Sequence, residues 1–344
     1  MTPALAPRLQ PPTTRLLTVW CGLVLGLCGL LAAASPALAQ ATVASTDYPN
    51  RPIRVIVPFS PGGAVDGPMR AIAQELSRQL RQQVVIDNKP GAGATIGSEM
   101  VAKAPADGYT LLLASQTNAI SASLYTRLSF NPVEDFVAIS LLGREPGVLV
   151  VHPTMPVKSV AELIAYAKAR PGQLNYASSG NGSGQHLFMA MFASMAGLQL
   201  THVPYRGSGQ ATTDLLGGTV TMAMPGTAGM VGHVRAGKLR ALATTGSARS
   251  TQLPDVPTLA EAGLAGYSAY VWMGLLAPKG TSPAIVDRLQ RELKIALAAP
   301  EVKAFFAEAG VEAVGSGAAE FAAFFRDERE RWSRVVKDTG ARID

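Results

Sequence analysis

The sequence predicts an α/β protein of two lobes, each a mostly parallel sheet flanked by helices. Short β-branched runs alternate with segments of helical apolar spacing along most of the chain. About 305 residues follow an N-terminal leader, a length that favours two domains over one. The chain is expected to pass between the lobes near residues 147 and 268. These observations predict a two-strand hinge, with a ligand cleft between the lobes.

The first 39 residues are predicted to be a secretory signal peptide. Arg8 and Arg15 are the only charges in this segment, residues 16–34 form an apolar run, and Ala37-Leu-Ala39 has the small-residue pattern of a cleavage site. A retained transmembrane anchor is the alternative, because the run approaches spanning length. Its glycines and the cleavage pattern favour removal after Ala39 and export by the Sec route.

Composition excludes several classes of function. Cys21 and Cys28 both lie in the leader, so the mature chain has no cysteine for disulfides or thiolate chemistry. The net charge of +6 falls by two, to +4, once the leader arginines are removed, and no basic block with interleaved aromatics indicates nucleic acid. The histidines lack metal-site spacing, so we expect no metal and no cofactor; they are His152, His186, His202 and His233.

The first lobe is expected to comprise residues 47–147 and 268–344. Its opening strand, Ile53–Val57, is an apolar β-branched run, and the segment from Val65 to Leu80 has helical spacing. The same alternation then predicts strand Val84–Asp87, helix Gly97–Ala104 and strand Thr110–Ala114. Strands that alternate with helices in this way favour parallel βαβ units, with ligand sites at the carboxyl ends of the strands.

The second lobe is expected to span residues 148–267. It begins with strand Val148–Val151 and a helix over Ser159–Ala169, where Ser159 followed by Glu162 has capping-box spacing. Further along, the pattern predicts the strands Leu174–Ala177, Thr201–Pro204, Val220–Met224 and Ala241–Thr244, and a helix over Gln185–Met195.

The chain then returns to the first lobe through a strand over Ala269–Leu276. Apolar residues at helical spacing predict three closing helices after this strand, which are Pro283–Ala298, Pro300–Ala309 and Ala318–Lys337. The first lobe is therefore discontinuous in sequence.

A candidate anion site follows the first strand, at residues 58–66. Pro-Gly-Gly breaks the strand sharply, and the helix that follows presents unpaired backbone N–H groups at its N-terminus. The predicted ligand contacts of this loop are Phe59, Ser60, Gly62, Gly63 and Asp66. For Asp66 two roles stay open: it caps the helix, or it faces the cleft to receive an amine or hydroxyl of the ligand.

A second loop, residues 178–184, repeats this arrangement in the second lobe. It lies between a strand and a helix and offers three hydroxyls and three glycines, although either loop alone could be an ordinary βα connection. Two such loops together indicate a ligand with carboxylate groups. The predicted contacts here are Ser178, Ser179, Gly182, Ser183 and His186. Further candidates at strand ends are Thr117, Asn118, Tyr205, Arg206, Pro225 and Thr227.

Enzyme motifs fail on inspection, so no catalytic residue is predicted. Residues 91–97 space their last glycine one position too far for G-x-G-x-x-G, and residues 232–239 end in Leu where a phosphate-binding loop has Ser or Thr. No G-x-S-x-G elbow is present. A hydrolase remains a minor alternative, for which Ser183 and His186 are the one neighbouring nucleophile and base.

At this point the sequence resembles the Bug (TctC-type) periplasmic solute-binding proteins of tripartite tricarboxylate transporters. The matching segments run in order along essentially the whole mature chain, and together they are specific. They are Tyr48-Pro with Pro52-Ile53, residues 57–63 with Asp66 and Arg70, residues 87–93 with Ile96-Gly97, residues 107–110, residues 175–180, Gly182-Ser183 with His186-Leu187, residues 203–207, residues 255–258, residues 261–263, and Trp272 with Gly274.

The resemblance implies a periplasmic binding-protein fold of type II-like form that closes on a small carboxylate and passes it to a membrane permease. In such proteins the two loops hold the ligand carboxylates, and the position of Asp66 meets the amino group of amino-acid ligands. The sequence departs from the family at residues 223–226, where many members have an acidic or amide residue, and at Gly67-Pro68, which affects the expected start of the helix.

Several alternatives of ligand and partner stay open. The ligand is expected to be a dicarboxylate, an amino acid or an aromatic carboxylate. A ligand-responsive partnership with a sensor kinase is the alternative to transport. We expect a monomer with no nucleic-acid partner.

Overall fold

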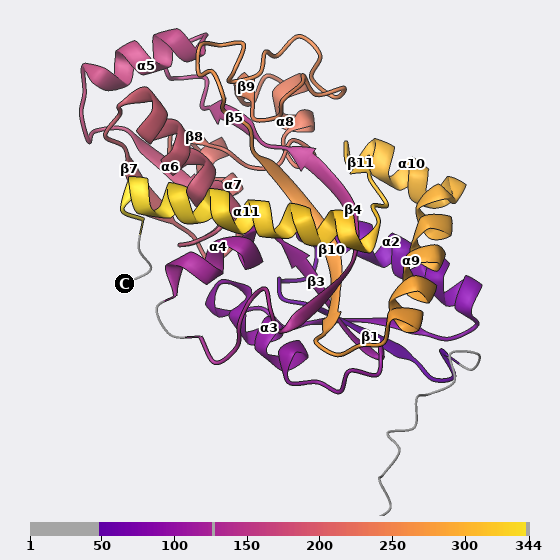
Figure 1. The fold of residues 1–344 in the computed structure, drawn as a ribbon. Helices are drawn as coiled ribbons and strands as arrows, with labels where there is room; N and C mark the ends of the chain where they lie inside the picture. The colour runs from indigo at the N-terminus through magenta and orange to yellow at the C-terminus, as the bar shows by residue number, and fades with distance from the viewer. Residues whose placement is uncertain (1–47, 126–127, 342–344) are drawn as a thin grey trace, which may run out of the picture. The chain divides into compact units, whose positions relative to one another are not determined.

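The computed structural model describes residues 48–125 and 128–341, and Figure 1 shows the elements in chain order. The predicted signal peptide, residues 1–39, lies outside the described residues. All helices and strands discussed below belong to one unit, Pro49–Asp344. Within the described residues, no helix combines the length and apolarity that crossing a bilayer requires.

A six-stranded sheet carries the predicted first strand at its parallel end. Its order is β11-β4-β10-β3-β1-β2. Strand β1 pairs in parallel with β2 on one side and with β3 on the other. Strands β4, β10 and β11 join antiparallel. The bounds are β1 Ile53–Val57, β2 Val84–Asn88, β3 Thr110–Ser115, β4 Phe136–Pro146, β10 Tyr270–Pro278 and β11 Glu312–Ala313.

A five-stranded sheet contains the strands between residues 148 and 244. Its order is β7-β6-β8-β5-β9, with β6 parallel to β7 and β8, and β5 antiparallel to β8 and β9. The bounds are β5 Val148–Val151, β6 Asn175–Ser178, β7 Thr201–Pro204, β8 Met222–Ala223 and β9 Arg240–Thr244. The α/β class with two sheets is confirmed.

The expectation of mostly parallel sheets is wrong, because both sheets are mixed. In the first sheet, the long strands β4 and β10 run antiparallel to each other over nine residue pairs. Strand β4 was missed from the sequence altogether. It lacks a clean period-two alternation, since its half-buried first residues are followed by a continuous buried run.

Helices follow the predicted positions closely where their apolar spacing is regular. Helix α9 has the predicted bounds, while α2, α3, α5, α6, α10 and α11 shift by one or two residues at an end. Helices α4, α7 and α8 were not predicted. The bounds are α2 Asp66–Leu80, α3 Thr95–Ala102, α4 Gln116–Leu124, α5 Val160–Lys168, α6 Gly184–Ala196, α7 Ser208–Leu216, α8 Val231–Arg235, α9 Pro283–Ala298, α10 Pro300–Glu308 and α11 Ala318–Thr339. The 3₁₀ turn η1 is Ala92–Ala94.

The cap of α5 differs from the predicted capping box. The Ser159 hydroxyl accepts a hydrogen bond from Glu162 N at 3.2 Å, as predicted. The Glu162 carboxylate, however, accepts from Lys158 N at 2.7 Å, one residue before the cap. At α2, the Gly67-Pro68 pair does not displace the helix, which begins at Asp66, because a proline in the first turn needs no intrahelical N–H partner.

The connection from β4 to β5 is fixed by hydrogen bonds to the loop after β8. Val148 N donates to Pro225 O at 2.8 Å, and Thr227 donates to Pro146 O through both its backbone N–H and its hydroxyl. Gly147 N donates to the Thr245 hydroxyl at 2.6 Å, and this hydroxyl donates to Ala269 O. Both places where the chain passes between the sheets are therefore held together at one point.

Helix α11 contacts elements of both sheets' helical layers. It packs on β4, a strand of the first sheet, and on α4, the helix that follows β3 of that sheet. It also packs on α6, the helix that follows β6 of the second sheet. Trp332 is buried and stacks on Phe188 of α6 with a ring-centroid distance of 5.5 Å. The indoles of Trp272 and Trp332 both donate to the Glu328 carboxylate, at 2.8 and 3.0 Å. This buried cluster joins β10 to α6.

Candidate functional site

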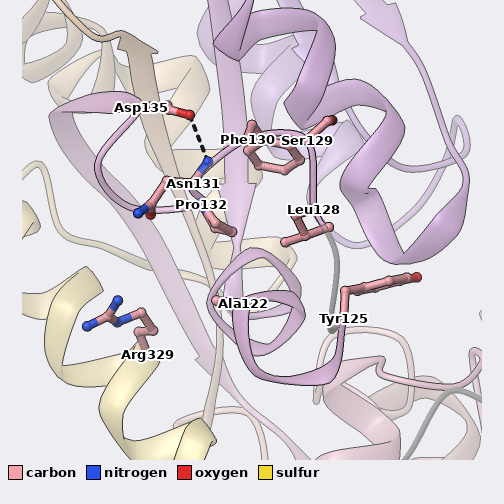
Figure 2. Close-up of a pocket in the computed structure, with 9 residues that line it drawn as sticks. All are labelled: Ala122, Tyr125, Leu128, Ser129, Phe130, Asn131, Pro132, Asp135 and Arg329. Carbon is pink, nitrogen blue, oxygen red and sulfur yellow. Dashed lines mark hydrogen bonds between the residues drawn. The ribbon is translucent and has the colours of Figure 1, made fainter.

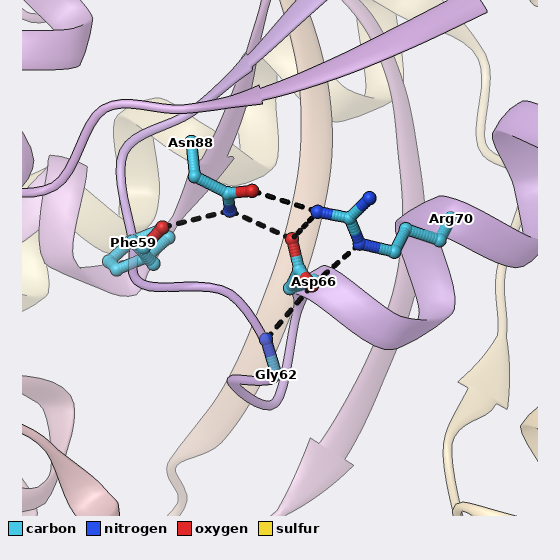
Figure 3. A network of polar contacts seen from close by, with 5 residues as sticks. All are labelled: Phe59, Gly62, Asp66, Arg70 and Asn88. Carbon is cyan, nitrogen blue, oxygen red and sulfur yellow. Dashed lines mark hydrogen bonds and ion pairs between the residues drawn. The ribbon is translucent and has the colours of Figure 1, made fainter.

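The loop between β1 and α2 is organised around Asp66 (Figure 3). The Asp66 carboxylate accepts from Gly62 N at 3.0 Å, from Arg70 Nε at 2.8 Å and from Asn88 Nδ2 at 2.8 Å. Asn88 Nδ2 also donates to Phe59 O at 3.0 Å. Because these contacts reach both ends of the loop, Asp66 fixes the loop's conformation. Ser60 and Gly62 are exposed and Gly63 is half-buried, so the turn itself faces outward.

Asp66 does not have the first of the two roles that the sequence left open, that of the helix cap. It is the first residue of α2 and not the cap; the cap position is Val65, which makes no side-chain capping bond. Its side chain is 3% exposed. Burial alone raises the pKa of Asp66, but the hydrogen bonds from Arg70, Asn88 and Gly62 outweigh burial, and the net pKa is lowered. The carboxylate is ionised and its charge is paired within the protein.

The loop between β6 and α6 is shaped by a cap and a turn. The Ser183 hydroxyl caps α6 by accepting from His186 N at 3.3 Å. Ser178 is fully buried, and its hydroxyl accepts from Gly180 N at 3.1 Å. The cap uses the third N–H of the helix, and the N–H groups of Gly184 and Gln185 have no intrahelical partner. The helix N-terminus thus retains donors for an anion, while Ser179 is half-buried beside it.

Two stacked imidazole rings form hydrogen bonds with residues of this second loop. The rings of His186 and His202 lie 3.9 Å apart at 3°, and Tyr176 stacks on His202 at 4.9 Å. His186 Nδ1 accepts from Gly182 N at 3.2 Å, and His202 Nε2 is 2.6 Å from the Ser178 hydroxyl. Burial lowers the pKa of His186 to about 4, and burial together with the neighbouring His186 lowers that of His202 to about 4. Both rings are neutral at pH 7.

This geometry does not provide the hydrolase pairing. The Ser183 hydroxyl is bonded to the backbone of His186, and the His186 ring is directed at Gly182 N instead of at Ser183. A general base needs its ring nitrogen within hydrogen-bond reach of the nucleophile. In this structure Ser183 and His186 are therefore not arranged as a nucleophile and its base.

The predicted ligand contacts after β3, Thr117 and Asn118, take part in the hydrogen bonds that cap α4. Asn118 forms a capping box with Ser115 and donates to the Ser98 hydroxyl at 2.8 Å, so both ends of its amide are engaged. Thr117 is 8% exposed at the start of α4. The neighbouring residue, Gln116, was missed. Its side-chain oxygen accepts from Trp272 N at 3.2 Å, and a Cβ added to Gly184 would lie 2.5 Å from its Nε2. Gln116 thus lies directly against the N-terminus of α6.

The candidates after β7 have contrasting surroundings. The Tyr205 hydroxyl donates to Asp214 at 2.8 Å; burial and this partner raise the phenol's pKa to about 12. Arg206 is exposed, and within the described residues it has no ion-pair or hydrogen-bond partner. It is therefore a guanidinium that a ligand or another protein can reach.

The loop after β8 meets a buried carboxyl that sequence reasoning missed. Pro225 and Thr227 are buried and hold the β4–β5 connection through their backbone and hydroxyl groups. Glu145, near the end of β4, is 3% exposed, and its carboxyl accepts from Ala228 N at 2.7 Å. Burial raises its pKa to about 7, against the hydrogen bond from Ala228. Glu145 differs from the other acidic residues in being buried without an ion-pair partner among the described residues, and no sequence motif indicates this burial.

A hollow of the described surface lies elsewhere. It has a volume of about 530 Å³, lies beside the end of α4 and is rimmed by Arg329 of α11; Figure 2 shows its nine lining residues. None of the predicted ligand contacts lines it. Asn131 and Asp135 of its wall close a local turn on themselves, with Asn131 N donating to Asp135 at 2.7 Å. These groups are engaged in the turn, so the loops after β1 and β6 remain the better candidate site.

In the part of the chain that the structure describes, no group of three or more acidic, histidine or cysteine side chains is arranged to hold a metal.

Comparison with known proteins assigns the family. Residues 69–341 match the model of the tripartite tricarboxylate transporter family receptor, TctC. The chain belongs to this family. BugT of Bordetella pertussis is 42% identical over 305 residues, which cover 88% of this chain and 94% of BugT.

Solved structures agree with this assignment to the TctC family. Rpa4515 of R. palustris, solved with adipate, has a TM-score of 0.80 and 35% identity, covering 86% of this chain and 99% of that one. MatC of Rhodopseudomonas palustris, with bound malate, has a TM-score of 0.78 and 32% identity, covering 84% and 100%. The family is one of periplasmic solute-binding proteins, so the sequence resemblance is confirmed.

Proposed function

We propose that this protein captures a small organic carboxylate between its two lobes and delivers it to a membrane permease of the tripartite tricarboxylate type. The lobes are those expected from the sequence, residues 47–147 with 268–344 and residues 148–267. The chain reaches the periplasm by a signal peptide removed after Ala39. It acts without catalysis.

The observation that supports this proposal is a loop-to-helix turn in each half of the molecule, one after β1 of the first sheet and one after β6 of the second. The turn at 58–66 is held rigid by Asp66, and the turn at 178–184 opens α6 with free N–H donors. Such turns bind carboxylates through backbone N–H groups and the helix dipole. Gln116 lies against Gly184, so elements of the two sheets meet beside the second turn. The predicted contacts from Phe59 to Thr227 remain proposals, and among them Arg206 is an exposed side chain that a ligand can reach.

The same geometry narrows the ligand class. Asp66 already accepts from Arg70, Asn88 and Gly62, so its charge is not available to a ligand ammonium. We therefore favour acids without an amino group over amino acids. A dicarboxylate suits two loop-to-helix turns, one for each carboxylate. Adipate and malate, bound by Rpa4515 and MatC, are the first probes.

Native mass spectrometry of the purified protein, followed by a thermal-shift panel, tests this proposal. The panel compares adipate and malate with aspartate and glutamate. A ligand at one hundred times its dissociation constant stabilises the folded protein by about 2.7 kcal/mol. We expect stabilisation by at least one non-amino carboxylate and none by the amino acids. An absence of any carboxylate response, with no acid released from the native protein, would contradict the proposal.

Gly63→Leu supplies the variant arm of this experiment. A Cβ at Gly63 meets only Ser60 O, at 3.4 Å, so the fold tolerates the change while the side chain obstructs the turn. We expect binding of the responding acid to fall by about a hundredfold or more, because the leucine side chain keeps the anion away from the polar groups of the turn. Gly209→Leu is the matched control, because the position is exposed with open space around it. Equal affinity of the two variants would remove the 58–66 turn from the site.

A further inference from the structure

We propose that closure of the cleft takes up a proton on Glu145, so that this residue links carboxylate capture to pH. This inference rests on the proposed function for its ligand, but its central step concerns the protein alone. Glu145 stands at the end of β4, next to the β4–β5 connection through which the chain passes between the sheets.

Glu145 is enclosed by elements on both sides of this connection. A cavity of about 10 Å³ beside it is lined by Ala64 and Val65, which follow the first turn, and by β4 and β10. Such a volume holds about one water molecule. On its other side, a Cβ added to Gly226 would lie 2.5 Å from Glu145 Oε1, and Ala228 N donates to Oε2. The carboxyl thus lies between the first turn and the loop after β8.

No cation among the described residues compensates the Glu145 carboxylate. The nearest one in sequence, Arg144, lines the same cavity but forms a two-point ion pair with Glu312 at 2.8 and 3.0 Å and lies over the Tyr270 ring. Asp66, which follows Ala64 and Val65, is itself acidic and is paired with Arg70. Val271 and Met273 of β10 and residues 225–228 contribute no titratable group. A buried carboxylate with one hydrogen bond and no ion pair is costly, whereas a carboxylic acid is not.

Opening of the lobes exposes this carboxyl to water. Separation at the hinge would withdraw the first turn, with Ala64 and Val65, from the loop after β8, and a solvated glutamate ionises near its ordinary pKa of 4.5. In the enclosed position that Glu145 has in this structure, which we take as the closed form, burial raises its pKa to about 7. Closure therefore binds a proton between these two values. A carboxylate ligand held by the neighbouring turns strengthens the effect, because a second negative charge disfavours ionisation of Glu145.

The sign of the pH dependence follows directly. A group whose closed-state pKa is raised favours closure fully below the open-state pKa, and this advantage is lost as the pH rises through the closed-state pKa. Ligand affinity should fall by up to about tenfold per pH unit between about pH 5 and pH 7, and level off above that. The neutral isostere Glu145→Gln keeps an acceptor for Ala228 N and should abolish this dependence.

A disulfide that locks the closed form tests the proton step without a ligand. The mature chain has no cysteine, and a Cβ at Gly184 lies 3.0 Å from Gln116 Cγ, which places the two Cβ atoms within the range of about 4.5 Å that a disulfide needs. In oxidised Gln116→Cys/Gly184→Cys protein, infrared spectroscopy should show a protonated carboxyl band that is lost as the pH rises through about 7. Adding Glu145→Gln should remove the band, and adding Glu308→Gln, at an exposed position away from the cavity, should leave it.

Calorimetry with adipate and malate supplies the ligand step. Titrations in two buffers of different ionisation enthalpy, at a pH between the two pKa values, should show proton uptake on binding by the wild type and by the Glu308→Gln control. The Glu145→Gln variant should show none. If neither acid binds, the proposed ligand class fails and the infrared result still decides the proton step. The inference is overturned if the locked protein and its Glu145→Gln variant have the same carboxyl spectrum at every pH.

Discussion

At the scale of single residues, the chemistry of this protein lies in carboxyl groups with opposite surroundings. Asp66 is buried with three donors and stays ionised, whereas Glu145 is buried with one donor and no cation among the described residues. Both are acidic side chains in a protein of net positive charge. Environment alone thus makes one a structural anion and the other a group that holds a proton near neutral pH.

Asp66→Ala should destabilise the fold by about 2 kcal/mol or more, because it leaves Gly62 N, the Asn88 amide and Arg70 without their acceptor. The contribution is present above about pH 3.8 and is lost as the pH falls through the lowered pKa. Chemical denaturation at neutral pH measures it.

Glu301→Ala is the matched control for this substitution. Glu301 is also an acidic residue in the first turn of a helix, but it is exposed, so its loss removes only a helix-dipole interaction of about 0.3–1 kcal/mol. Equal losses in the two variants would show that Asp66 acts only through the dipole and does not organise the loop.

At the scale of elements, the sequence predicted what local patterning determines. Helix α9 has the predicted bounds because Ser282 caps it, proline occupies its first position and its apolar residues recur regularly. The turns after β1 and β6 were located for the same reason, since glycine and serine mark them. The missed helix α4 is capped by Ser115 but lacks regular apolar spacing: seven of its nine residues are buried, polar ones included. Its burial comes from α11, which packs on it from the other end of the chain.

Contacts between distant elements set the limit of prediction at the candidate site. Gln116 and Glu145 stand in no recognisable sequence motif, and their roles follow from contacts with distant segments. Gln116 lies against Gly184, and Glu145 accepts a hydrogen bond from Ala228 N. The antiparallel course of β4 and β10 was equally invisible, because strand direction depends on the partner strand and not on periodicity.

The contact between α4 and α6 yields a prediction at this scale. Gly184→Ala places a methyl group 2.5 Å from Gln116 Nε2 and 3.0 Å from its Cγ, so Gln116 must move away from Trp272 N or α6 must shift. We expect a loss of about 1–3 kcal/mol in unfolding free energy, together with weaker ligand binding. Denaturation and calorimetry with adipate measure the two effects.

Gly209→Ala serves as the control, because it is also a glycine near a helix start but has open space around it. Alanine there should be neutral or stabilise by up to about 1 kcal/mol. A neutral result for Gly184→Ala as well would mean that α4 and α6 do not touch in solution.

At the scale of the whole molecule, the two sheets depend on one helix for part of their common core. Helix α11 brings Glu328 beneath the indoles of Trp272 and Trp332 and pairs it with Arg331 at 2.7 Å. Arg331 in turn donates to Ser268 O, just before β10. The segment that returns from the second sheet to the first is therefore tied to the C-terminal helix by a buried carboxylate.

Glu328→Ala should accordingly cost about 3–5 kcal/mol, because two buried indole N–H groups and a guanidinium lose their shared acceptor. Glu330→Ala, two residues along the same helix and exposed, should change stability by about 0.5 kcal/mol or less. Denaturation monitored by tryptophan fluorescence measures the first loss and reports on the indoles themselves. If Glu328→Ala unfolded as the Glu330→Ala variant does, the two indoles would have other acceptors, and α11 could not be what couples β10 to α6.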